Sequence, residues 1–135
     1  MIAYVDTSVV LQVLFRQGKA HRAWARWTHA YASELLGVES RRMIDRLRLM
    51  GELDDEGVAA AHQQLVAIED GIGRVALNRP VLRRASLPMP TIVKTLDAIH
   101  LASALLLQER HPVPISFLTH DDKLLRAATS LGFLA

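Results

Sequence analysis

Four acidic residues lie far apart along the chain, but each stands near the end of a predicted strand or the start of a predicted helix: Asp6, Glu39, Asp97 and Asp121. Two of them closely follow apolar runs of strand length, 2–5 and 115–118, and the other two fall in the early turns of predicted helices. Carboxylates are the hard oxygen ligands that Mg²⁺ and Mn²⁺ prefer. A bound divalent cation orients a water molecule, lowers its pKa and shields the charge that builds up on a phosphodiester during hydrolysis. These residues predict metal-assisted chemistry, provided that the fold gathers them.

Asp97 stands at the start of a helix that is predicted to begin at Thr95. The residues after it are apolar on nearly every side, which indicates a helix buried in the domain. With Thr95 as N-cap, Asp97 falls in the first turn, where free backbone N–H groups and the helix dipole favour a negative charge. Completing the helix start is therefore a sufficient structural role, and a chemical role depends on the other three acids.

Asp6 ends the apolar run 2–5, which predicts a buried strand. Thr7 and Ser8 offer caps for a following helix that closes near Gly18. Asp6 thus lies at the carboxyl end of a strand, the edge at which ligands bind in open parallel sheets. Capping the next helix is the alternative role for its carboxylate.

Glu39 lies in the second turn of a helix predicted from Glu34 to Gly51, with Ser33 as its N-cap. Glu34 competes with Glu39 for a place in the site, but its position at the helix start suits capping better. Four arginines follow and give this helix a basic side that either meets phosphates or faces solvent: Arg41, Arg42, Arg46 and Arg48.

The rest of the chain continues to alternate strands and helices. A helical stripe begins at Lys19, and within it Trp24 and Trp27 suit core packing better than stacking on bases. The other predicted elements are strands at 30–32, 75–77, 115–118 and 133–134, and helices at 54–71, 80–85 and 123–131.

This alternation predicts an α/β fold in which helices flank a parallel sheet. The carboxyl ends of the strands and the amino ends of the following helices then share one edge, so all four acids can converge there. Four buried carboxylates repel one another, and a hard divalent cation removes that cost. The sequence therefore predicts an ion site at this edge.

Length and composition are those of one globular domain spanning residues 1–135, half of whose residues are hydrophobic. The absence of cysteine excludes disulfides and thiol nucleophiles and fits a cytoplasmic protein. No signal peptide and no membrane-spanning run are expected. Thirteen of the sixteen basic residues are arginine. If four acids gather in one pocket, the rest of the molecule carries a net charge of +6. That balance suits a polyanion held by its phosphates, although for charge alone an ordinary arginine-rich surface is the better explanation.

Four segments together resemble the PIN-domain nucleases, and within them the VapC toxins of toxin–antitoxin pairs: Tyr4 to Ser8, Ser33 to Glu39, Thr95 to Ala102 and Phe117 to Asp121. The first segment is common by itself, whereas all four at these spacings are specific. The resemblance covers essentially the whole chain. It implies a three-layer α/β/α PIN-like domain with a central parallel sheet, and a metal-dependent endoribonuclease.

The same resemblance implies roles for single residues. Asp6 and Asp97 would be the principal ligands of Mg²⁺ or Mn²⁺, and Glu39 and Asp121 would complete the catalytic and metal site. Thr7 or Ser8, together with Thr119, would position these ligands by hydrogen bonds. The family pattern selects Asp121 over Asp122, which is expected to cap the last helix instead. Rim cations would hold flanking phosphates, with Lys94, Lys123 and Arg42 as candidates.

Partners are implied as well. The substrate would be RNA, with transfer and ribosomal RNA as targets, and a cognate antitoxin would wrap the toxin with its C-terminal segment. A homodimer is also expected. Val10, Leu14 and Trp27 are apolar positions that belong either to such surfaces or to the core.

Other classes fit less well. A haloacid dehalogenase-type phosphatase needs a second Asp two residues after the first, where this chain has Ser8. A receiver-like domain needs adjacent acids at the first strand, and no glycine-rich phosphate loop is present. A non-catalytic PIN-like module that binds RNA or protein remains the alternative. His100 and His120 could act as general bases, but metal-activated hydrolysis needs neither, and a helical His100 is expected to be packed or hydrogen-bonded.

Overall fold

A computed structural model describes residues 1–15 and 29–135. The described strands form one parallel sheet in the order β3-β2-β1-β4. They are β1 (Ile2–Val5), β2 (His29–Ser33), β3 (Gly73–Val75) and β4 (Ser116–Leu118). Leu134 adds a parallel bridge to Ser116 beyond β4, where an edge strand was predicted.

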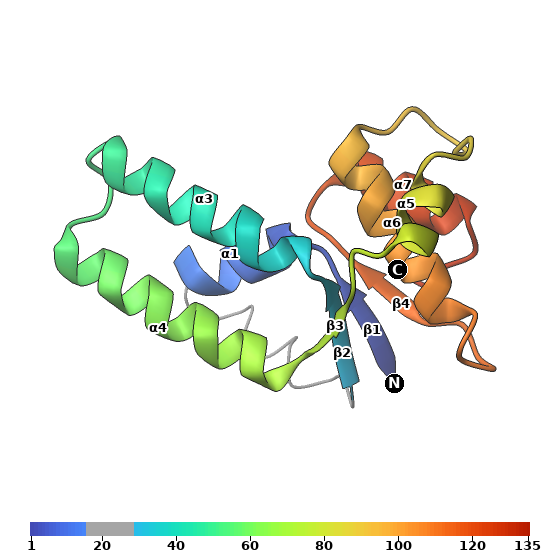
Figure 1. The fold of residues 1–135 in the computed structure, drawn as a ribbon, viewed down its shortest axis with the longest axis horizontal. Helices are drawn as coiled ribbons and strands as arrows, with labels where there is room; N and C mark the ends of the chain where they lie inside the picture. Colours follow the sequence, from blue (N-terminus) through green and yellow to red (C-terminus); the bar gives the residue numbers. More distant parts are fainter. Residues whose placement is uncertain (16–28) are drawn as a thin grey trace.

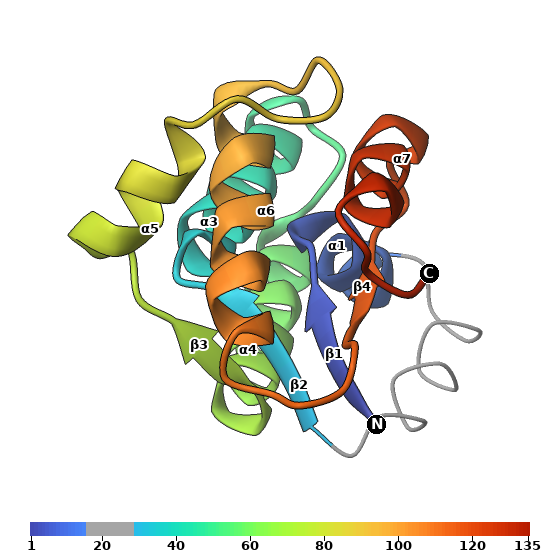
Figure 2. The ribbon, with the colours of Figure 1, turned by 90° about the vertical axis from the view of Figure 1, so that its right-hand side faces the viewer.

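Six helices in the described part of the chain cover both faces of this sheet (Figure 1). One face carries α1 (Thr7–Phe15), α3 (Leu35–Leu49) and α4 (Asp55–Gly71). The other carries α6 (Thr95–Gln108) and α7 (Asp122–Ser130), with the short α5 (Arg79–Ala85) packed against α6. Figure 2 shows α6 lying over the sheet with α5 and α7 on either side. The predicted three-layer α/β/α architecture is confirmed.

The central strand β1 joins two hydrophobic cores, because successive side chains of a strand point to opposite faces. Tyr4 belongs to the core under α6 and α7, and Val5 to the core under α1, α3 and α4. Both residues are completely buried. The residue that follows them, Asp6, is therefore placed by a strand that is fixed from both sides.

Most predicted elements are present with small displacements. β3 begins at Gly73 rather than at residue 75, because its pairing with β2 runs from Gly73 to Val75. The caps of α4 and α5 are Asp54 and Asn78, whose side chains accept from Gly57 N and Val81 N. The predicted helix end near Gly18, and the stripe with Trp24 and Trp27, lie outside the described residues.

The starts of α3 and α6 differ from the prediction. Thr95 is the first residue of α6 rather than its cap, and Lys94 takes the N-cap position without a side-chain cap bond. Glu34 occupies the N-cap position of α3 but makes no cap bond, so the capping role predicted for it is wrong. The Ser33 hydroxyl accepts from Leu35 N at 3.1 Å instead. Asp97 still lies in the first turn of its helix.

Val10 and Leu14 are buried in the core under α1, α3 and α4, which excludes them as partner-binding surface. Within residues 1–15 and 29–135, no helix has the length and apolar character needed to cross a membrane.

Candidate active site

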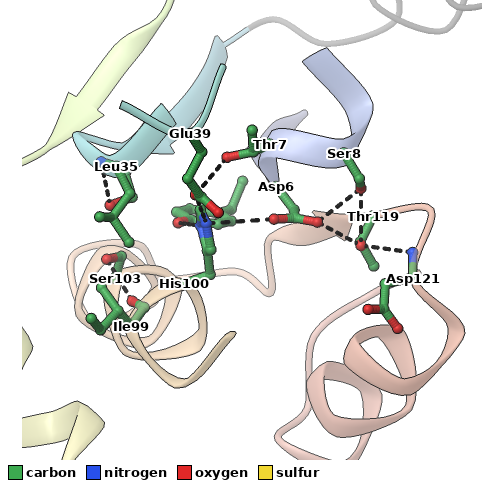
Figure 3. Close-up of polar contacts among 12 residues, drawn as sticks. Asp6, Thr7, Ser8, Leu35, Glu39, Ile99, His100, Ser103, Thr119 and Asp121 are labelled. Carbon is green, nitrogen blue, oxygen red and sulfur yellow. Dashed lines mark hydrogen bonds and ion pairs between the residues drawn. The ribbon is translucent and has the colours of Figure 1, made fainter. Parts of the chain in front are cut away.

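Asp6 leaves β1 at the carboxyl edge of the sheet, where it is 7% exposed. Its N–H donates to the Leu118 carbonyl at 2.9 Å and so continues the ladder between β1 and β4. The hydroxyls of Ser8 and Thr119 both donate to Oδ2, each at 2.8 Å (Figure 3). Oδ1 lies 3.5 Å from Nε2 of His100. Two donors thus fix the Asp6 carboxylate and leave its other oxygen toward the centre of the edge.

Glu39 reaches the same edge from the second turn of α3. Its Oε1 accepts from Thr7 Oγ1 at 2.9 Å and from His100 Nε2 at 2.7 Å. Burial raises the pKa of Glu39, but the hydrogen bond and charge of His100 and the bond from Thr7 outweigh burial and lower it. Since an ionised carboxylate only accepts, Nε2 of His100 carries a proton.

His100 is the buried centre of this cluster and is 1% exposed. Its Nδ1 lies 2.8 Å from the hydroxyl of Tyr4, whose pKa burial and the charge of Asp6 raise well above the usual value. Burial lowers the pKa of His100, yet the hydrogen bond to Glu39 and the charges of Asp6, Glu39 and Asp97 raise it overall. One imidazole therefore connects residues from β1, α3 and α6.

Asp97 is held differently from Asp6 and Glu39. Its carboxylate accepts no hydrogen bond and forms no ion pair within the described part of the chain. Burial raises the pKa of Asp97, and the negative charges of Asp121 and Asp6 raise it further against the opposing effect of His100. Unneutralised negative charge therefore lies at this edge.

Asp121 caps α7. Its Oδ1 accepts from Lys123 N at 2.9 Å and from Leu124 N at 3.2 Å. Its own N–H donates to Thr119 Oγ1 at 3.0 Å, so it also supports the hydroxyl that holds Asp6. The prediction that Asp122 caps the last helix is wrong. The extended backbone of Asp121 places the Asp121 carboxylate over the free N–H groups at the start of α7.

The four carboxylates approach one edge without closing around a common point. Among residues 1–15 and 29–135, no three carboxylate or imidazole groups are close enough to hold one ion together. The donors nonetheless fit a cation bound by two carboxylates and completed by water, as is usual for Mg²⁺. Asp6 offers Oδ1 and Asp97 both of its oxygens, and the raised pKa of Asp97 marks charge that a cation would neutralise. The metal ligands themselves stay a prediction.

The basic side of α3 is largely engaged in local ion pairs. Arg42 and Arg48 both contact Asp45 at 2.7 Å, and Arg41 contacts Glu69 at the same distance. Lys94 and Lys123 lie at the starts of α6 and α7, three residues before Asp97 and two residues after Asp121. These two lysines are the better candidates for holding phosphates.

Residues 3–129 match the PIN domain family, and the chain belongs to that family. It is similar to two proteins of Mycobacterium tuberculosis. Ribonuclease VapC46 is 30% identical over 96% of this chain and 92% of its own length. Ribonuclease VapC47 is 25% identical over 97% and 93% respectively.

Solved structures share the fold. FitAcB from Neisseria gonorrhoeae superimposes with a TM-score of 0.65 at 18% identity, over 96% of this chain and 94% of that one. A toxin–antitoxin complex from Klebsiella pneumoniae superimposes with a TM-score of 0.64 at 17% identity, over 90% of this chain and 88% of that one. VapBC2 from Rickettsia felis, bound to a DNA fragment from its promoter, superimposes with a TM-score of 0.64 at 10% identity, over 93% of this chain and 92% of that one.

The sequence pattern did not place His100 and Tyr4 among the acids. His100 was correctly predicted to be hydrogen-bonded, and its spacing of three from Asp97 was the available signal, because residues i and i+3 share a helix face. Tyr4 gave no such signal, since its contact spans 96 residues of chain. His120 is exposed and contributes its backbone N–H to Ser8 at 3.0 Å.

Proposed function

We propose that this protein is a metal-dependent endoribonuclease that serves as the toxin of a toxin–antitoxin pair. The observation that carries the proposal is that two carboxylates fixed by hydrogen bonds, those of Asp6 and Glu39, lie at the same sheet edge as the carboxylate of Asp97, which accepts no hydrogen bond from the described residues. Membership of the PIN family and similarity to two VapC ribonucleases support it.

The proposed site uses its residues in distinct ways. Mg²⁺ or Mn²⁺, bound by Asp6 and Asp97 with Glu39 and Asp121 around it, would lower the pKa of a water and neutralise charge on the phosphodiester. Ser8 and Thr119 keep Asp6 in place. Glu39 stays ionised and accepts a hydrogen bond from the attacking water.

The water molecule attacks the phosphorus atom of the RNA backbone in line with the 3′-oxygen, which leaves. The product therefore carries a 5′-phosphate. Lys94 and Lys123 hold the flanking phosphates, as basic side chains commonly do in nucleic-acid complexes. Transfer RNA and exposed ribosomal RNA loops are the proposed targets, and the proposed compartment is the cytoplasm.

The proposed partners are a cognate antitoxin and a second copy of the chain. Two of the structural relatives are a toxin–antitoxin complex from Klebsiella pneumoniae and VapBC2 from Rickettsia felis. Size-exclusion chromatography of the chain, with and without the product of its neighbouring gene, tests both partners: a mass that matches neither a dimer nor a complex contradicts them.

One observation favours a second function. Since no three ligands converge in the described residues, the cluster of acidic residues at the carboxyl edge of the sheet would also suit a non-catalytic PIN-like module that binds RNA or protein.

Cleavage of a cellular RNA pool separates the two functions. Wild-type protein and the Asp97→Asn variant are incubated with Mg²⁺ or Mn²⁺, and 5′-phosphate ends are mapped. The nuclease gives discrete cuts that require both the metal and Asp97. Folded, antitoxin-free protein that makes no cuts with either metal would contradict the nuclease and favour the binding module.

A further inference from the structure

His100 has no assigned role in the proposed reaction, yet it has contacts with several elements at the acidic edge (Figure 3). Its ring contacts Tyr4 on β1, Asp6 at the end of β1 and Glu39 on α3. We propose that His100, held by Tyr4, is a positioning residue that sets the orientation of Glu39 and its separation from Asp6, and thereby the geometry in which this edge binds a divalent cation. This inference rests on the proposed function.

The orientation of the imidazole is determined by partners at both nitrogens. Turning the ring over would replace each nitrogen by a carbon and lose the 2.8 Å contact with Tyr4 and the 2.7 Å contact with Glu39 together. Tyr4 is itself rigid, because it is completely buried and its ring stacks on Phe117 with centroids 5.2 Å apart. The hydroxyl of Tyr4 therefore acts as a fixed reference for the ring.

Nε2 of His100 stands between two carboxylates that would otherwise repel each other. It lies 2.7 Å from Glu39 Oε1 and 3.5 Å from Asp6 Oδ1. Without this donor, Thr7 alone would hold Glu39, whose side chain is 24% exposed and has room to turn toward solvent. Asp6 would keep its orientation, because Ser8 and Thr119 hold it independently. Loss of His100 should therefore act mainly through Glu39.

The same contact ties two acid-bearing helices together. Asp97 and His100 are three residues apart in α6 and share one face, so the bond from His100 to Glu39 anchors the first turns of α6 to α3. A merely structural histidine would contribute to stability alone, whereas a positioning histidine also affects how the edge binds an ion.

Three variants and one control separate these roles. His100→Leu removes both hydrogen bonds, His100→Gln keeps a donor near the place of Nε2, and Tyr4→Phe removes the hydroxyl that orients the ring. Ala104→Gly is the control, because it loosens a buried position one turn further along α6 without removing a polar contact.

The first readout is the affinity of the full chain for Mn²⁺, measured by electron paramagnetic resonance without RNA. Steady-state RNA cleavage and the melting temperature Tm are measured alongside. For His100→Leu we expect Mn²⁺ affinity and kcat to fall about tenfold or more, with the KM for RNA changed less than about twofold. His100→Gln should retain most of the wild-type Mn²⁺ affinity and kcat. Tyr4→Phe should have values between those of the wild type and His100→Leu. Ala104→Gly should lower Tm and bind Mn²⁺ like the wild type.

Unchanged Mn²⁺ affinity in folded His100→Leu, or an equal loss in Ala104→Gly, overturns the positioning role while leaving the nuclease intact. If His100→Leu does not fold, His100→Gln and Tyr4→Phe decide: no change in Mn²⁺ affinity or kcat in Tyr4→Phe contradicts the proposal. A wild-type chain that neither binds Mn²⁺ nor cuts RNA overturns the proposed function and this inference with it.

Discussion

The two sides of the acidic edge are built differently. On one side, Asp6 and Glu39 each accept two hydrogen bonds from side chains of other residues. On the other, Asp97 accepts none from the described residues, and Asp121 uses one oxygen for the backbone of α7. The first side is held by hydrogen bonds within the protein, whereas the second leaves carboxylate oxygens without such bonds among the described residues.

This difference separates the carboxylates that are already held in position by hydrogen bonds from those that still have oxygens available to a ligand. Hydrogen bonds lower the pKa of Glu39, while burial and neighbouring negative charge raise that of Asp97. A cation should therefore gain most from Asp97 and depend on Asp6 and Glu39 for its position. Four predictions test the contrast.

The largest effect is expected at the unpartnered carboxylate. Asp97→Asn keeps the size of the side chain but removes the charge, so RNA cleavage should fall at least about a hundredfold. Because no hydrogen bond is lost, Tm should not decrease. Cleavage assays and thermal unfolding of the same preparation measure both. Wild-type activity in this variant would sink the assignment of Asp97.

A smaller loss is expected where a hydroxyl holds Asp6. Thr119→Val removes the 2.8 Å bond to Asp6 and the acceptor for Asp121 N, and should lower kcat about tenfold. Thr119→Ser keeps the hydroxyl and is the matched control, expected within about twofold of the wild type. If Val and Ser behave alike in a cleavage assay, the hydroxyl does not organise the site.

At the helix cap the change should appear in stability. Asp121→Ala loses both bonds to the start of α7 and should cost about 1 kcal/mol of unfolding free energy. Asp122→Ala removes only a favourable charge near the helix dipole and should cost a few tenths of a kcal/mol. Urea unfolding measures both. Asp121→Asn keeps the cap, so a loss of cleavage in that stable variant would show that the charge of Asp121 serves the reaction.

The smallest effect is a pH dependence of stability. A carboxyl whose pKa is raised on folding destabilises the folded state while it is ionised, and this cost disappears as pH falls and the group is protonated. Asp97→Asn should therefore be more stable than the wild type near about pH 7, and the gap should narrow toward about pH 4. Unfolding free energies across this range measure the gap, and a gap that stays constant would show that Asp97 carries no such penalty.

Local patterns were enough for the order of the elements and the places of Asp6, Glu39 and Asp97. A run of buried residues before Asp6 and an apolar helix after Asp97 report the periods of strand and helix directly. Helix caps were less predictable. Asp121 and Asp122 are adjacent acids, and the choice between them depends on the backbone angles of one residue.

The sequence by itself determined the α/β fold, the family and which acidic residues approach one sheet edge, because strand and helix periods and short motifs are local properties of the chain. Only the tertiary structure decided which of those acids have partners. His100 meets Tyr4 and Glu39 across 96 and 61 residues of chain, and such contacts depend on how α6 and α3 pack against β1. Hydrogen bonds between distant residues follow from packing, which no local spacing encodes.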